Sequence, residues 1–171
     1  MESYVVFKES KKDAVYKEML PQLRSLLEGE QDAIANLSNT VAVLKMAFPA
    51  AISWVGFYFR QGRELVLGPF QGKPACVRIQ MGKGVCGVSA EQRKTLIVPD
   101  VNAFPGHIFC DPESKSEIVV PILAKGELQG VLDIDSAMPA CFDETDQHYL
   151  EQIVEQISRD VARHINNTMQ S

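Results

Sequence analysis

The chain has 171 residues, of which 46% are hydrophobic and 23% charged, and its formal net charge is −5. This length fits one domain with a sizeable core, and the composition is that of a globular protein rather than a disordered one. The acidic balance argues against wholesale binding to nucleic acid or anionic lipid, and no apolar run approaches the roughly 18 residues of a membrane span. Because the first residues begin no signal sequence, we expect a cytoplasmic protein, in which clustered cysteines are more often catalytic, redox-active or metal-binding than structural.

Two helical patterns come first. Residues 10–28 place apolar side chains on one stripe, although Pro21 is expected to kink this helix or to begin a new segment. Residues 30–47 repeat apolar side chains at spacings of three or four. The stripe of this second helix consists of Ile34, Leu37, Val41, Leu44 and Phe48.

The pattern then changes to that of strands. Residues 52–59 form an aromatic run typical of a strand, Gln61-Gly62 predicts a turn, and residues 64–68 form a second strand. Residues 69–95 are punctuated by glycines, and one short helix is expected after Gly84-Val85-Cys86-Gly87.

Three further strands are expected, and a loop precedes the last two. Residues 95–98 form a short apolar strand, and residues 99–116 form a long polar loop of the kind that is more often functional than decorative. Residues 117–123 and 128–135 are strands joined by a turn at Lys125-Gly126.

The last helix begins at Asp143, which is a good N-cap, with Asp146 at the capping-box position. The order of elements predicts an α+β domain with one mostly antiparallel sheet and helices packed on one face. The loop-and-helix segment between the strands is expected to cover the other face of the sheet, with a ligand pocket beneath its loops.

Three carboxylates stand on the last two strands. Asp133 and Asp135 share a face because side chains alternate along a strand, and Ile134 faces the other way. A two-residue turn at Lys125-Gly126 sets Glu117 opposite Ile134, on the wrong face, whereas an odd-length loop or a β-bulge brings it opposite Asp133. The sequence leaves both registers open. The alternative to a functional site is that the end of this strand is exposed and its two aspartates are solvated.

Two aromatic residues share a face of the first strand. Trp54 and Tyr58 flank Gly56, and a glycine in mid-strand often marks the close approach of a ligand or another backbone. The pair could form the wall of a small apolar pocket, or the two rings could be ordinary core aromatics.

Three of the four cysteines, Cys76, Cys86 and Cys110, lie in the Gly- and Pro-rich stretch from residue 68 to residue 112. A catalytic thiol needs access and a lowered pKa or a nearby proton donor. Four buried free thiols are one alternative. A zinc site made by His107 with these three cysteines is another, although the chain has no Cys-x-x-Cys pair.

The chain resembles the free methionine-(R)-sulfoxide reductases, which are single GAF domains, and the resemblance is clearest from Trp54 to Asp146. The segments that carry it are Trp54-Val55-Gly56-Phe57-Tyr58, residues 67–76 (LGPFQGKPAC), Gly82-Lys83-Gly84-Val85-Cys86-Gly87, residues 98–101 (VPDV), Phe104-Pro105-Gly106-His107, Cys110-Asp111, residues 116–121 (SEIVVP) and residues 130–136 (GVLDIDS). The three cysteines make it specific, because most GAF domains lack them.

The resemblance implies a single GAF domain over residues 1–171, with N-terminal helices at about 10–48, sheet and pocket at about 50–137, and a C-terminal helix at about 143–167. It implies thiol-dependent reduction of free L-methionine-(R)-S-oxide, through a cysteine sulfenic acid and an intramolecular disulfide, with thioredoxin as reductant. No metal or organic cofactor is required, and domains of this kind commonly form homodimers. A non-catalytic GAF sensor of a small ligand, or a redox sensor, is the alternative.

The same resemblance assigns roles to eight residues. Cys110 is the nucleophile, and Cys76 and Cys86 are the resolving and recycling thiols. The remaining residues bind the substrate or move protons: Glu117 and Asp135 flank the sulfoxide oxygen, Asp133 holds the ammonium group, and Trp54 with Tyr58 encloses the S-methyl group.

We also expect a disulfide from Cys110 to Cys76 or Cys86, with Cys76 preferred, partly from the resemblance and partly because Pro74 favours one defined pairing. Such a bond needs Cα atoms within about 7 Å, so residues 99–116 must fold back over residues 69–87. Cys141 is extra to the pattern and is expected to be structural.

Overall fold

The computed structural model describes residues 11–108 and 110–168. The elements, in chain order, are α1 (Lys12–Leu27), α2 (Ala33–Ala47), β1 (Trp54–Gln61), β2 (Glu64–Gln71), β3 (Arg78–Gln80), α3 (Gly84–Gln92), β4 (Leu96–Val98), the 3₁₀ turn η1 (Val101–Ala103), β5 (Ser116–Ala124), β6 (Glu127–Ser136) and α4 (Glu144–Thr168). The strands form one antiparallel sheet in the order β3-β2-β1-β6-β5-β4.

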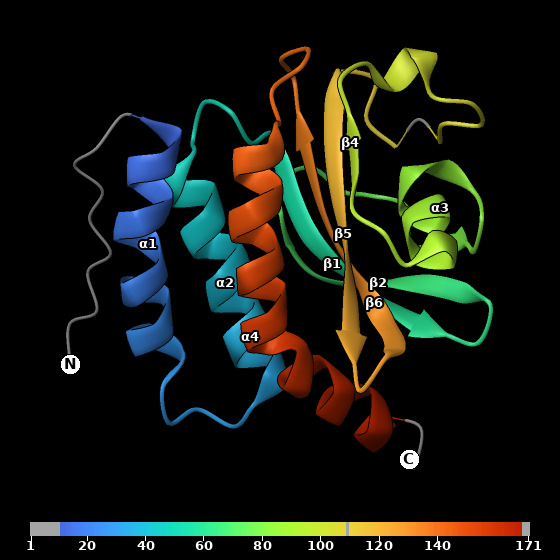
Figure 1. The fold of residues 1–171 in the computed structure, drawn as a ribbon. Helices are drawn as coiled ribbons and strands as arrows, with labels where there is room; N and C mark the ends of the chain where they lie inside the picture. The colour runs from blue at the N-terminus through green and yellow to red at the C-terminus, as the bar shows by residue number, and fades with distance from the viewer. Residues whose placement is uncertain (1–10, 109, 169–171) are drawn as a thin grey trace.

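The sheet separates two layers of unequal thickness. Helices α1, α2 and α4 cover one face, while α3 and the segment 99–116 lie on the other (Figure 1). The expected α+β architecture is therefore confirmed. No helix of the described residues is both long and apolar enough to cross a membrane.

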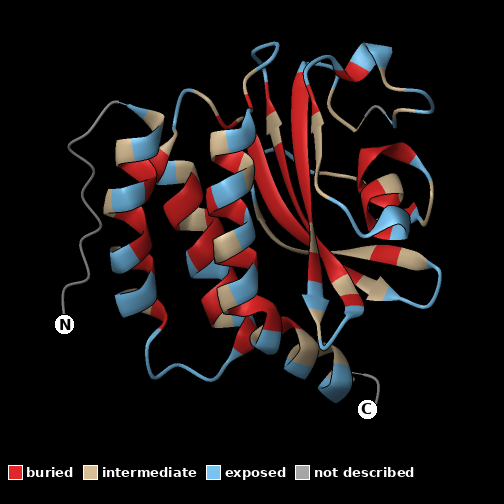
Figure 2. Ribbon diagram, in the orientation of Figure 1, coloured by how far each residue is buried: buried red, intermediate tan, exposed pale blue. Residues whose placement is uncertain are grey.

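The main core lies between the three long helices and the sheet. Alternate residues of β1, namely Val55, Phe57 and Phe59, point into it and meet the inward stripe of α4. A second, smaller apolar cluster lies on the opposite face, where Trp54 and Tyr58 pack with residues of α3. The central strands are consequently buried on both sides (Figure 2).

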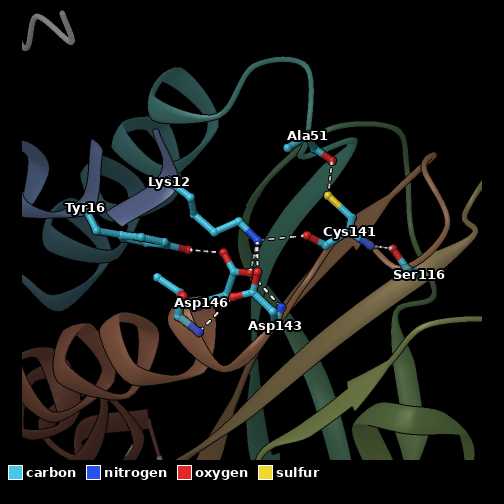
Figure 3. Close-up of polar contacts among 8 residues, drawn as sticks. Lys12, Tyr16, Ala51, Ser116, Cys141, Asp143 and Asp146 are labelled. Carbon is cyan, nitrogen blue, oxygen red and sulfur yellow. Dashed lines mark hydrogen bonds and ion pairs between the residues drawn. The ribbon is translucent and has the colours of Figure 1, made fainter. Parts of the chain in front are cut away.

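The start of α4 is fixed by the predicted capping box. Asp143 Oδ1 accepts a hydrogen bond from the backbone N–H of Thr145 at 2.8 Å, and Asp146 Oδ2 accepts one from the N–H of Asp143 at 2.8 Å. Asp146 also binds α1, because it accepts hydrogen bonds from Lys12 Nζ at 2.6 Å and from Tyr16 Oη at 2.9 Å (Figure 3). The capping residue thus joins the first and last helices.

Cys141 lies beside this junction, just before α4. Its carbonyl accepts a hydrogen bond from Lys12 Nζ at 3.0 Å, its N–H donates to Ser116 Oγ, and its side chain packs partly buried against the main core (Figure 3). The thiol is free and stands apart from the other three cysteines, which agrees with a structural role.

Four details differ from the sequence-based expectations. Pro21 does not begin a new helical segment, because α1 is one helix that runs through it, and at its exposed position water can replace the hydrogen bond that proline forfeits. Ile34 does not belong to the buried stripe of α2, since it is 40% exposed. Strand β2 extends three residues beyond Gly68, and the three-residue strand β3 was not expected. The predicted helix start at residue 10 lies outside the described residues.

Candidate active site

A pocket lies on the face of the sheet opposite to the three long helices, beneath α3 and the segment 99–116 (Figure 1). Its empty volume is about 570 Å³, part of which is continuous with solvent. Seven of the eight residues selected from the sequence line it, namely Trp54, Tyr58, Cys86, Cys110, Glu117, Asp133 and Asp135, and the eighth, Cys76, is bonded to Cys110.

The carboxylates meet because the β5–β6 hairpin contains a bulge. Ala124 pairs with Glu127 across the expected two-residue turn, but the register shifts by one residue beyond Leu123. Glu117 consequently pairs with Asp135, which corrects the expectation that it lies opposite Asp133. The shift still places Glu117 on the same face as both aspartates, as the bulged alternative required.

Burial governs the charge of this cluster. Glu117 and Asp133 are only 5% and 6% exposed, and loss of solvent raises the pKa of each carboxyl well above its usual range. Repulsion by Asp135 adds to the effect on both, and repulsion by Asp133 adds to it on Glu117. Burial also raises the pKa of Asp135, to about 6, while the hydrogen bond from Ser114 Oγ to its Oδ1, at 2.6 Å, acts in the opposite direction. The three carboxyl groups of the pocket therefore differ in how far their pKa values are raised.

Two of the thiols are joined. Cys76 and Cys110 form a disulfide with their Cα atoms 5.8 Å apart, so the segment 99–116 does fold back over the segment that carries Cys76. The preferred pairing from the sequence is the one observed. It leaves Cys86 as the free thiol of the pocket.

Cys86 lies at the deep end of the pocket, in the first turn of α3. Its Sγ is 3.9 Å from Glu117 Oε1, and burial, reinforced by the charges of Asp133 and Glu117, raises the pKa of the thiol well above its usual range. Cys86 is therefore a buried thiol that is protonated at neutral pH, whereas Cys76 and Cys110, at the mouth of the pocket, are joined in a disulfide. Together with Glu117 and Asp133, it forms the one group of potential metal ligands found among the described residues.

The aromatic wall is fixed by hydrogen bonds to the segment that follows β2. Trp54 Nε1 donates to the carbonyl of Lys73 at 3.0 Å, and Tyr58 Oη donates to the carbonyl of Cys76 at 2.9 Å. Gly56 is required by the indole itself, since a Cβ at this position would lie 2.3 Å from an indole carbon. The close approach that the glycine indicated is thus made by the Trp54 indole and by the Cβ of Phe70.

Ser114 was not expected from the sequence, and it is buried against Asp135. The ring of His107, which the sequence offered as a zinc ligand, lies with Nδ1 4.0 Å from Glu117 Oε2. Lys73 forms ion pairs with Asp111 and Glu113, which tie the two disulfide-linked segments together a second time. The opposite charges of Lys73 and Asp111, each near a paired cysteine in sequence, were a signal that could have identified this contact.

Comparison with known proteins gives consistent matches. The chain matches the family model described as GAF domain over residues 31–159. It is 54% identical over 144 residues to GAF domain-containing protein A of Dictyostelium discoideum, which covers 84% of this chain and 90% of that protein. It is 44% identical over 155 residues to the free methionine-R-sulfoxide reductase of Saccharomyces cerevisiae, covering 86% of each. The solved structure of free methionine-R-sulfoxide reductase from Neisseria meningitidis in complex with its substrate matches with a TM-score of 0.91 and 46% identity, covering 96% of this chain and 99% of that one.

Proposed function

The chain belongs to the GAF domain family, and we propose that it is an oxidoreductase that reduces free L-methionine-(R)-S-oxide to methionine with its own thiols. The observation that carries this proposal is the Cys76–Cys110 disulfide at the mouth of a pocket lined by buried carboxyl groups and an aromatic wall. The similarity to reductases of that name supports the choice of substrate.

The proposed reaction consumes two thiols. The Cys110 thiolate attacks the sulfoxide sulfur while the oxygen is protonated, and the oxygen passes to Cys110 as a sulfenic acid while methionine is released. The sulfenic acid then condenses with the Cys76 thiol, which gives the disulfide and releases the oxygen as water. One sulfoxide and two thiols thus become one sulfide, one disulfide and one water.

We assign the proton chemistry to Glu117 and Asp135, which face each other across β5 and β6. Glu117 is the more deeply buried of the two, so it is the group that remains protonated and donates to the oxygen. Asp135 is ionised at neutral pH, because its pKa lies at about 6, and it orients the departing oxygen. Environments that separate two carboxyl pKa values in this way are typical of acid–base pairs.

We assign recognition of the amino acid to Asp133. Its Oδ1 accepts no hydrogen bond from any described residue, and the ammonium group of a free amino acid would supply one. A methionine residue inside a peptide has no such charge, which gives a physical reason for its exclusion. Trp54 and Tyr58 provide the apolar wall that an S-methyl group needs.

The disulfide must be reduced again for turnover, and we propose thioredoxin as the reductant in a reducing compartment such as the cytoplasm. Cys76 and Cys110 are partly exposed, so an external dithiol can reach their bond. Cys86 is buried and protonated, which favours Cys76 as the first resolving thiol and leaves Cys86 a part in recycling.

Steady-state turnover with dithiothreitol tests the substrate assignment. The R epimer of free methionine sulfoxide should be converted to methionine, whereas the S epimer and N-acetyl-methionine sulfoxide should not. If no sulfoxide is reduced although the protein binds one of them, the domain is a sensor of a small ligand and not an enzyme. Thioredoxin with its reductase and NADPH should then replace dithiothreitol in sustaining turnover.

A further inference from the structure

Three different elements bring soft and hard donor atoms together at the deep end of the pocket. Cys86 lies on α3, Glu117 on β5 and Asp133 on β6, and one donor atom from each lies within 4.8 Å of the other two. All three side chains are buried, with exposed fractions of 3%, 5% and 6%. A cysteine thiolate and aspartate or glutamate carboxylates are each among the ligands that bind Zn²⁺.

A second observation indicates that the cluster is directed at a ligand. Asp133 Oδ1 is buried and accepts no hydrogen bond from any described residue, although it faces the pocket. A buried carboxylate oxygen without a donor is costly, and a cation is the partner that satisfies it best. The His107 ring, whose Nδ1 is 4.0 Å from Glu117 Oε2, adds a nitrogen donor to the rim of the same cluster.

We propose that Cys86, Glu117 and Asp133 bind a borderline-soft divalent cation of the Zn²⁺ class. The thiolate selects against Mg²⁺ and Ca²⁺, which prefer oxygen ligands alone. Binding replaces the proton of Cys86 by a metal–sulfur bond and the proton of Glu117 by a metal–oxygen bond, and both protons are released to solvent. This ligand set differs from the one considered from the sequence, because Cys76 and Cys110 are not needed and can remain joined.

The site has a consequence for catalysis that rests on the proposed function. The cation and the substrate ammonium would both occupy Asp133, so each should exclude the other. Zinc would then inhibit the reductase competitively with methionine sulfoxide.

Cobalt spectroscopy on the oxidised protein tests the site without any turnover. With Cys76 and Cys110 held in their disulfide, Cys86 and Cys141 are the remaining free thiols. Titration with Co²⁺ should produce a thiolate-to-cobalt charge-transfer band that saturates at one metal per chain, and Zn²⁺ should abolish it. Cys86→Ser should eliminate the band, while the matched control Cys141→Ser should retain it.

Asp133→Asn provides a variant that keeps the shape of the side chain and the thiol. It should weaken Co²⁺ binding by more than the roughly 10–100-fold that loss of an outer-shell partner costs. Absence of the band in the wild-type protein, or a band that survives Cys86→Ser, would overturn the proposal. Free methionine sulfoxide should displace the metal; a stable band that the sulfoxide leaves unchanged would instead contradict the assignment of Asp133 to substrate binding.

Discussion

Ser114 connects the loop that closes the pocket to the carboxyl cluster beneath it. Its hydroxyl donates to Asp135 Oδ1 at 2.6 Å and stabilises the ionised form of that carboxyl. We expect Ser114→Ala to remove this effect and to raise the pKa of Asp135 above about 6. A hydrogen bond to a charged group is worth about 1.5–3 kcal/mol, which corresponds to a shift of about one to two pH units.

The pH dependence of kcat/KM measures this shift. The acid limb of the wild-type profile should reflect ionisation of Asp135 near pH 6 and should move to higher pH in Ser114→Ala. Ser114→Thr keeps the hydroxyl and should restore the wild-type limb. Identical acid limbs in the wild type and Ser114→Ala would show that Asp135 does not control the reaction in this way.

Asp133 should affect binding more than chemistry. Asp133→Ala removes the proposed partner of the substrate ammonium, and the loss of a charge-assisted hydrogen bond of about 1.5–3 kcal/mol should raise KM more than tenfold. The change in kcat should be much smaller. A variant with unchanged KM for the free amino acid would assign the ammonium to another residue.

At the scale of single residues, the sequence identified candidate site residues by their unusual type, and it missed contacts between residues that lie far apart in the chain. Thiols and carboxylates in strands and loops attract attention because they are costly to bury without a reason. Ser114 carries no such signal, since its partner Asp135 is 21 residues away and the contact depends on the course of the loop. The partner of Glu117 was missed for a similar reason, because a single bulge decides it.

The contact between the first and last helices depends on one buried carboxylate. Asp146 accepts hydrogen bonds from Lys12, from Tyr16 and from the N–H of Asp143 (Figure 3). Asp146→Ala leaves the buried Tyr16 hydroxyl without its acceptor and breaks the capping box, so we expect a loss of about 2–4 kcal/mol in the free energy of unfolding.

Urea denaturation measures this loss. Lys17→Ala is the matched control, because Lys17 forms an exposed ion pair with Asp13 one turn along the same helix, and it should leave the midpoint unchanged. Equal midpoints for Asp146→Ala and the control would show that α1 is held to α4 by apolar packing alone.

Elements with a repeated pattern or a defined cap could be predicted from the sequence. The start of α4 at its capping box and the two-residue turn at Lys125-Gly126 are both confirmed. The three-residue strand β3 has no periodicity to detect and exists because β2 offers a partner for it. The continuity of α1 through Pro21 likewise depends on the exposed position of this residue, which the residue type alone does not show.

At the scale of the whole molecule, the buried carboxyl cluster of the pocket should contribute stability in acid over a defined range of pH. Because burial raises the pKa of Asp135 from its ordinary value to about 6, the folded state binds this proton more tightly than the unfolded state. The stabilisation is fully present below about pH 4 and is lost as the pH rises through about 6, with a total of up to about 3 kcal/mol. Glu117 and Asp133 shift in the same direction and add to the slope.

Denaturation curves at several pH values, recorded with a chelator present, measure this dependence. Asp135→Asn should reduce the fall in stability between pH 4 and pH 7, whereas Glu155→Gln, at an exposed position of α4, should leave it unchanged. A slope that is the same in Asp135→Asn and the wild type would contradict the raised pKa.

The most direct measurement is a single turnover without any external reductant. Fully reduced protein is mixed with an excess of racemic free methionine sulfoxide, and methionine, remaining epimers and free thiols are counted by chromatography, mass spectrometry and peptide mapping. We predict about one methionine per chain, consumption of the R epimer alone and a disulfide between Cys76 and Cys110, with no product from Cys110→Ser. Absence of methionine, or methionine formed without loss of two thiols, would contradict the account.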